Sequence, residues 1–394
     1  MRRGGAWTVI PAAMLILAAA SLFPGGCGGE DLSGQLLNLL RERSGTVSSI
    51  RFTCITEDGA NTYREEVEFL LPDHLRYRMY DLGQDPPRLL TVIAQEENGL
   101  YRFRSSGGVS REGKPVEELF RDIPPLRNRG SYLSLYHLLG NGDYYSSLTA
   151  LIHSGVLLVT ARDEISGKSC YHLCSAPAQE PAMEIWVDTE YGLPLRKEMT
   201  LEGGRKLIFS YQDLEIDSLQ ALEPFPAGVE SGAEGAGLEA KDGGCRPLSL
   251  EEAGAVLGFA PLVPEIPGFE LYRAWWRDPA ASGDPSERSL RFPEGFRELY
   301  LVYRSGNRQL EIRESPFLKD FGYYTTGLAT LSEVYLAHRE TLGEEEGNAL
   351  YAASLDCQEM HLLAGEVEVT VTGDAWREEM RDLARRLHSM AGSR

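Results

Sequence analysis

Short segments in which apolar and polar residues alternate follow one another through most of residues 48–216. An alternation with a period of two residues is typical of strands that have one buried face. Asp58-Gly59 and Asn98-Gly99 stand between such segments, and both dipeptides favour the two-residue turn of a β-hairpin. Because strands joined by tight turns pair antiparallel, we predict a long antiparallel meander in this part of the chain.

Segments with a helical period lie before and within this meander. The leucines between residues 31 and 43 recur at helical spacing, and so do the apolar residues of Tyr132–Leu139 and Tyr144–His153. We predict amphipathic helices at these three places and a shorter helix at Val116–Phe120. The order of helix, meander, helices and meander predicts an α+β fold, in which a curved antiparallel sheet carries helices on one face.

A change of composition divides the chain in two. Residues 226–246 are rich in glycine, alanine and acidic side chains and contain no aromatic residue, which predicts a flexible linker. Residues 247–394 contain further strand-like segments and end in a helix whose apolar stripe includes Met380 and Leu387. We therefore predict a first domain at residues 35–225 and a second, smaller α+β domain at residues 247–394.

The N-terminus predicts export. Arg2 and Arg3 precede an apolar run from Ala6 to Phe23, which is the order of a secretory signal peptide. Small residues and Cys27 follow this run and resemble the lipobox of bacterial lipoproteins, with Pro24 where that motif usually has leucine.

The lipobox resemblance implies that residues 1–26 are removed, that Cys27 is diacylated and that residues 27–34 form a tether. The protein would then be exported and anchored to the outer face of the cytoplasmic membrane, or to an outer membrane where the cell has one. Ordinary signal cleavage, with Cys27 an incidental residue, is the alternative.

Charge and motifs exclude several functions. The net charge is −20, and it becomes −22 without residues 1–26, which hold two arginines and no acid, so we expect no nucleic-acid partner. The sequence contains no His-Glu-x-x-His run and no Gly-x-Ser-x-Gly elbow, and Gly167-Lys168-Ser169 lacks the earlier glycine of a phosphate-binding loop. We therefore expect no enzyme and no cofactor.

The cysteines that remain after export are odd in number, so at least one thiol is free or paired between chains. They are Cys54, Cys170, Cys174, Cys245 and Cys357. Cys170, His172 and Cys174 share one face of a predicted strand, but strand geometry separates the two thiols by about 13 Å. This is too far for one disulfide and a poor fit to one metal ion, so we interpret these residues as structural and expect no metal.

Apolar residues on the predicted strands are either plain core or the lining of a ligand cavity. A strongly curved sheet that faces helices can leave a gap between the two layers, and such a gap accommodates acyl chains or an apolar peptide. The candidate lining residues are Val67, Phe69, Tyr77, Met79, Tyr101, Phe103, Phe209 and Tyr211.

The segment Ile185–Arg196 combines an apolar strand, an aspartate, a Gly-Leu-Pro turn and an arginine that begins the next strand. Together with Leu71–Arg76 and Leu207–Tyr211, it resembles the outer-membrane lipoprotein carrier superfamily, which is LolA-like and includes LolB-type receptors and the first domain of RseB-type sensors. The resemblance covers about residues 35–225. It implies a half-barrel sheet capped by helices that enclose a hydrophobic cavity for lipoprotein acyl chains.

The second domain resembles, through Leu262–Phe269 and the final helix, a small domain of unknown function on bacterial envelope lipoproteins. We therefore expect a membrane-anchored, non-enzymatic lipoprotein that binds acyl chains or acylated lipoproteins in its first domain. The order of the two domains is also similar to that of RseB-type regulators. The alternative is accordingly a sensor whose second domain binds an envelope protein such as an anti-sigma factor.

Overall fold

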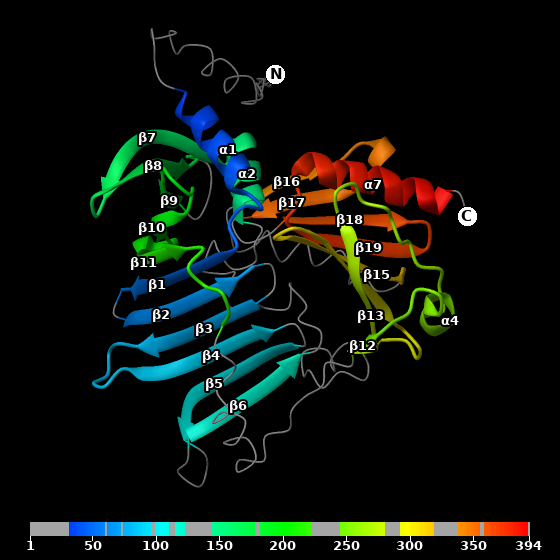
Figure 1. The fold of residues 1–394 in the computed structure, drawn as a ribbon, viewed down its shortest axis with the longest axis horizontal. Coiled ribbons are helices and arrows are strands. Elements are labelled where there is room, and N and C mark those ends of the chain that lie inside the picture. The colour runs from blue at the N-terminus through cyan, green and yellow to red at the C-terminus, as the bar shows by residue number, and fades with distance from the viewer. Residues whose placement is uncertain are drawn as a thin grey trace, which may run out of the picture.

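The computed structural model shows two open antiparallel sheets, one of 11 strands and one of eight (Figure 1). The structure describes residues 31–59, 61–71, 74–96, 99–109, 115–122, 144–177, 182–222, 245–279, 292–318, 337–354 and 358–392. The predicted α+β fold, with a meander sheet followed by a second α+β unit, is confirmed. The predicted signal segment and Cys27 lie outside the described residues.

The first sheet consists of two meanders that meet at the pair β1–β11, and its strand order is β6-β5-β4-β3-β2-β1-β11-β10-β9-β8-β7. Its strands are β1 (Ser49–Asp58), β2 (Asn61–Leu70), β3 (His74–Asp81), β4 (Arg88–Glu96), β5 (Gly99–Val109), β6 (Pro115–Asp122), β7 (Leu157–Ile165), β8 (Lys168–Ser175), β9 (Ala182–Asp188), β10 (Pro194–Thr200) and β11 (Lys206–Ile216). A one-turn helix, η2 (Glu202–Gly204), joins β10 to β11. The predicted strands of this half are therefore present.

Two helix predictions have other outcomes. The segment Val116–Phe120 is not helical but forms most of strand β6, which pairs antiparallel with β5. Pairing with an available strand edge outweighs the weak local preference of such a short segment for helix. The helix predicted at Tyr132–Leu139 lies outside the described residues.

Two helices accompany the first sheet, α1 (Leu32–Arg43) and α2 (Tyr144–His153). They pack against one another and against β7, so they lie at the β7 end of the sheet (Figure 1). The Asp31 carboxylate accepts a hydrogen bond of 2.9 Å from the backbone N–H of Gly34 and caps α1. The predicted tether at 27–34 is therefore too long, because this cap starts the helix at Leu32.

The turn between β9 and β10, which lies in the segment that carries the family resemblance, is built around Asp188. One oxygen of its buried carboxylate accepts the backbone N–H groups of Glu190 and Tyr191, at 2.9 and 2.7 Å. The other oxygen accepts the N–H of Leu193 at 2.7 Å. Three orphan backbone donors of the turn are thereby satisfied by one side chain.

Both helices dock on this turn. The hydroxyls of Tyr144 and Tyr145 donate to the carbonyl oxygens of Gly192 and Tyr191, at 2.6 and 3.1 Å. Gly192 has a φ of +72°, and a Cβ at this position would lie 2.9 Å from Cδ2 of Leu40 in α1. Glycine is therefore required both for the turn and for the close approach of α1.

The second sheet has the strand order β12-β13-β14-β15-β19-β18-β17-β16. Its elements are β12 (Cys245–Pro247), α4 (Ala253–Leu257), β13 (Glu270–Arg277), β14 (Glu298–Ser305), β15 (Arg308–Pro316), β16 (Ala337–Thr341), η4 (Glu344–Glu346), β17 (Leu350–Ser354), β18 (Gln358–Ala364), β19 (Val367–Gly373) and α7 (Arg377–Gly392). Met380, Leu383 and Leu387 of α7 are buried in the core of this sheet, as their helical spacing predicted. The last two residues of the predicted linker, Cys245 and Arg246, belong to β12 because they pair with β13.

Helix α2 contacts both sheets. It packs against β7 of the first sheet and against β16 and β17 of the second (Figure 1). Its residues from Tyr144 to Ile152 are all buried. The hydroxyl of Ser146 donates a hydrogen bond of 2.9 Å to the Asp374 carboxylate, and the Asn307 amide donates one of 2.9 Å to the Val47 carbonyl. Polar contacts and a shared helix therefore connect the two halves. No helix among the described residues has the length and apolar character needed to cross a membrane.

We predict that Asp188→Ala lowers the free energy of unfolding by about 3 kcal/mol, because it leaves three backbone N–H groups of the turn without their charged acceptor. Asp188→Asn keeps one accepting oxygen and should cost less. Urea unfolding followed by far-UV circular dichroism measures both changes. Wild-type stability of the alanine variant would show that the turn does not depend on this carboxylate.

Candidate functional site

The candidate site is the apolar face of the first sheet across β1–β3 and β10–β11. The register pairs Phe52 with Val67 and Val67 with Tyr77, which places side chains of three neighbouring strands in one row. Phe209 pairs with Thr56 and thereby extends the face onto β11. Because side chains alternate along a strand, every second residue of each of these strands lies on this same face.

Five of the predicted lining residues are buried, and they belong to the same core as the leucines of α1 and α2. These five are Val67, Phe69, Tyr77, Phe209 and Tyr211. Met79 is partly buried and packs against this core. Tyr101 and Phe103 lie on β5, where the structure does not describe side chains. The structure thus brings six of the eight residues together, packed as core.

Two charged side chains interrupt this apolar face, and sequence reasoning missed both. Glu65 of β2 is 3% exposed, and Lys197 of β10 is 1% exposed. The Glu65 carboxylate accepts hydrogen bonds from the hydroxyls of Thr56 and Tyr77, at 2.6 and 2.7 Å. The Lys197 ammonium lies 4.2 Å from the centroid of the Phe209 ring. The face therefore offers one anionic and one cationic group inside an apolar surrounding.

A signal for Glu65 was present in the sequence. Residues 63, 65, 67 and 69 alternate onto one face of β2, so the face that buries Val67 and Phe69 also receives Glu65. Lys197 gave no such signal, because Arg196 and Glu198 on either side of it are also charged.

The pKa of the Cys54 thiol is affected by both of these buried charged groups. Burial raises the pKa of the thiol far above its ordinary range, the nearby Glu65 carboxylate raises it further, and Lys197 lowers it. A cysteine in such surroundings stays protonated and inert.

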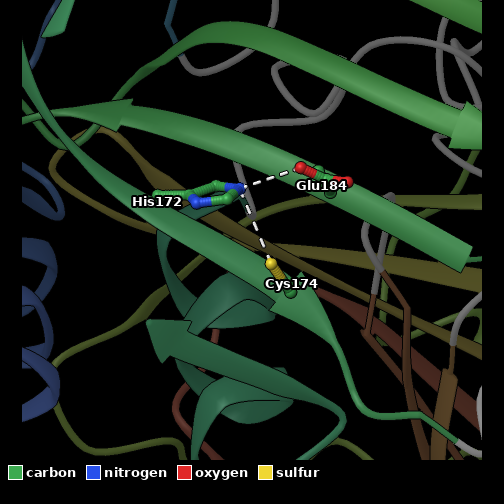
Figure 2. Close-up of side chains that lie close together, drawn as sticks. All are labelled: His172, Cys174 and Glu184. Atoms are coloured by element: carbon green, nitrogen blue, oxygen red, sulfur yellow. Dashed lines mark hydrogen bonds and ion pairs between the residues drawn. The ribbon is translucent and has the colours of Figure 1, made fainter. Parts of the chain in front are cut away.

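The opposite face of the sheet carries a second group of side chains, shown in Figure 2. His172 and Cys174 of β8 lie beside Glu184 of β9, and one potential ligand atom from each lies within 4.8 Å of the others. The His172 Nε2 atom is 3.5 Å from the Cys174 sulfur and 3.1 Å from a Glu184 oxygen. Cys170 is on this face too, as its spacing predicted, but it is buried beside Trp186.

Comparisons with known proteins give structural likeness alone. No family model and no curated protein matches the chain. The MucA/MucB complex of Pseudomonas aeruginosa matches with 16% identity over 89% of this chain and 96% of that one, with a TM-score of 0.31. The Mycobacterium tuberculosis lipoprotein LppX matches with 13% identity over 48% of this chain and 99% of that one, with a TM-score of 0.27.

A LolA superfamily protein from Nitrosomonas europaea matches with 14% identity over 49% of this chain and 96% of that one, with a TM-score of 0.21. The matched structures thus include LolA-type and MucB proteins, which are the types that the motifs around Asp188 resemble. Identities and TM-scores this low assign no ligand or partner to this chain.

We predict that iodoacetamide at pH 8 labels Cys174 in the folded protein and leaves Cys54 and Cys170 unmodified. Cys174 is only partly buried, whereas burial, assisted by Asp163, raises the pKa of Cys170 to about 11. At pH 8 only about one in a thousand Cys170 side chains would then be a thiolate. Peptide mass mapping after alkylation tests this order, and rapid labelling of Cys54 would show that the apolar face opens to solvent.

Proposed function

We propose that the protein is an exported, lipid-anchored and non-enzymatic binding protein, which accommodates an acyl chain of a lipid or lipoprotein on the apolar face of its first sheet. The observation that carries the proposal is the burial of Glu65 and Lys197 within that face. A face built only for stability would gain from apolar residues at both positions, because a buried charge rarely recovers its cost of desolvation. Departures of this kind concentrate at functional sites.

The ligand that fits such a face is an amphiphile. Each CH₂ group of an acyl chain contributes about 0.8 kcal/mol when it leaves water, so a long chain needs no charged partner along its length. A buried ammonium and a buried carboxylate would instead hold the polar end of the molecule. The sequence resemblance of residues 35–225 to lipoprotein carriers supports the same class of ligand.

Binding would have to replace contacts within the protein. Val67 and Phe209 are fully buried in the present structure, so an incoming chain must substitute for their neighbours. Helices α1 and α2 pack at the β7 end of the sheet, whereas Val67 and Tyr77 lie on β2 and β3, toward its other part (Figure 1). The ligand would therefore occupy the face over β1–β3.

The first experiment is native mass spectrometry, followed by solvent extraction, on residues 28–394 expressed in a bacterial periplasm. It compares the wild type with Lys197→Met and with the matched control Lys206→Met. Lys206 on the neighbouring strand is exposed and pairs with Glu198 at 3.5 Å. We expect a bound phospholipid or acylated peptide in wild type and Lys206→Met, and a loss of at least about tenfold in occupancy in Lys197→Met, as removal of one charged contact predicts. An apo mass that persists after incubation with lipids and lipopeptides would sink the proposal.

A second function, that of a sensor, is favoured by helix α2. Val67 and Tyr77 share one core with Leu148 and Leu151 of α2, and α2 also packs on the second sheet, so a ligand that repacks this core would shift α2 against the second half. The second domain would then bind an envelope protein, and its affinity would depend on the lipid in the first domain.

We predict that lipid changes the amount of one stoichiometric membrane protein captured from solubilised envelopes, and that Ser146→Ala weakens this dependence by removing the bond to Asp374. The control is Ser154→Ala, whose hydroxyl bonds within the first half, to the Leu151 carbonyl. Capture with and without added lipid measures the effect. Equal capture by the wild type in both conditions would contradict the sensor function.

A further inference from the structure

We propose that His172, Cys174 and Glu184 form a zinc site with an open fourth position on the outer face of the first sheet (Figure 2). This site lies on the opposite face of the sheet from the proposed lipid site and does not depend on that function. Imidazole, thiolate and carboxylate are the three side-chain types that bind Zn²⁺, and a site with three protein ligands leaves its fourth position to water or to an added ligand.

The separations between the ligand atoms fit a tetrahedral ion. Zinc–ligand distances of about 2.0–2.3 Å give tetrahedral edges of about 3.6 Å between sulfur and nitrogen and about 3.4 Å between nitrogen and oxygen. The corresponding distances here are 3.5 Å from Cys174 Sγ to His172 Nε2 and 3.1 Å from His172 Nε2 to Glu184 Oε2. The side chain of Glu184 is 48% exposed. It therefore has room to adjust the third edge, between its own oxygen and the Cys174 sulfur.

The strand register explains why these three side chains meet. Cys174 and His172 are two residues apart on β8 and therefore point to the same face. Cys174 pairs with Glu184, and His172 pairs with Trp186 on β9. The two cysteines considered from sequence, Cys170 and Cys174, are too far apart for one ion, and it is the carboxylate from the neighbouring strand that completes the set.

The imidazole of His172 is held in the orientation that a metal ligand needs. Its ring stacks on Trp186, with centroids 4.5 Å apart and planes 7° apart. The indole N–H of Trp186 in turn donates a hydrogen bond of 3.1 Å to Asp163. Outer contacts of this kind fix ring orientation at metal sites and affect metal affinity by about 10–100-fold.

Thr160 offers a hydrogen-bond partner to the ring nitrogen of His172 that would not bind the metal. Its hydroxyl donates to the backbone carbonyl of His172 at 3.1 Å, and the same oxygen lies 3.5 Å from His172 Nδ1. With the hydroxyl proton donated to the carbonyl, the oxygen is placed to accept from Nδ1–H when Nε2 binds the ion. The Nε2 atom itself points to the place where Cys174 and Glu184 converge, and metal binding would replace any proton it carries there.

The site is accessible without opening the core. The His172 side chain is 20% exposed, and Cys174 is half-buried with a free thiol. On binding, the thiol loses its proton to water and the thiolate forms the bond to Zn²⁺, so no oxidant or reductant is required.

The test is a titration of residues 28–394, which contain every element described above, with Co²⁺ in metal-free reducing buffer. We expect one Co²⁺ per chain, with a thiolate-to-cobalt charge-transfer band that Zn²⁺ abolishes by displacement. Cys174→Ser should remove the band, and His172→Gln and Glu184→Gln should weaken binding at least about tenfold. Circular dichroism verifies that each variant is folded.

The matched control is His338→Gln. His338 also lies beside a carboxylate, with 3.7 Å between its Nε2 atom and Glu340, and its variant should bind like the wild type. Absence of the band, or equal binding by all variants, would overturn the proposal and assign the metal to adventitious acidic groups. A disulfide at Cys174 in protein isolated from the periplasm without reductant would overturn it as well.

Discussion

The buried carboxylate of Asp188 is the contact on which the first half of the molecule depends. It binds three backbone N–H groups of the β9–β10 turn and so fixes the shape of that turn. The carbonyls of the same turn then accept hydrogen bonds from Tyr144 and Tyr145, which bring α2 onto the sheet. One side chain thus determines where a helix lies, because a turn without its internal acceptor would not present those carbonyls in fixed positions.

The inner face of the sheet combines side chains whose burial stabilises the fold with charged groups whose burial costs free energy. Burial of Val67 and Phe209 stabilises the fold by about 1.5–3 kcal/mol for each side chain, whereas burial of Glu65 and Lys197 costs desolvation energy. The hydrogen bonds that Glu65 accepts from Thr56 and Tyr77 offset part of this cost. The proposed binding of an amphiphile would exchange internal contacts for contacts to the ligand, with little net change in apolar burial.

Sequence patterns predicted what depends on local periodicity, and they failed where distant segments decide. The strands, the helix at Tyr144–His153 and the shared inner face of the six described candidate residues followed from alternation and helical spacing. Strand β6 did not, because its pairing with β5 outweighs the local pattern of Val116–Phe120. Lys197 and Glu184 were also missed, because the contacts that make them notable are to residues of neighbouring strands. The sequence alone does not give the register between those strands.

The register of β8 against β9 determines both faces of the sheet at once. Leu173 and Ile185 point into the core, while His172 and Glu184 point outward, because successive side chains of a strand alternate. A slip of one residue would bring the outward side chains into the core and separate the three candidate zinc ligands. The same burial of apolar residues that selects the register therefore also assembles the outer group. A bound ion would in turn link β8 to β9 and add to the free energy that maintains this register.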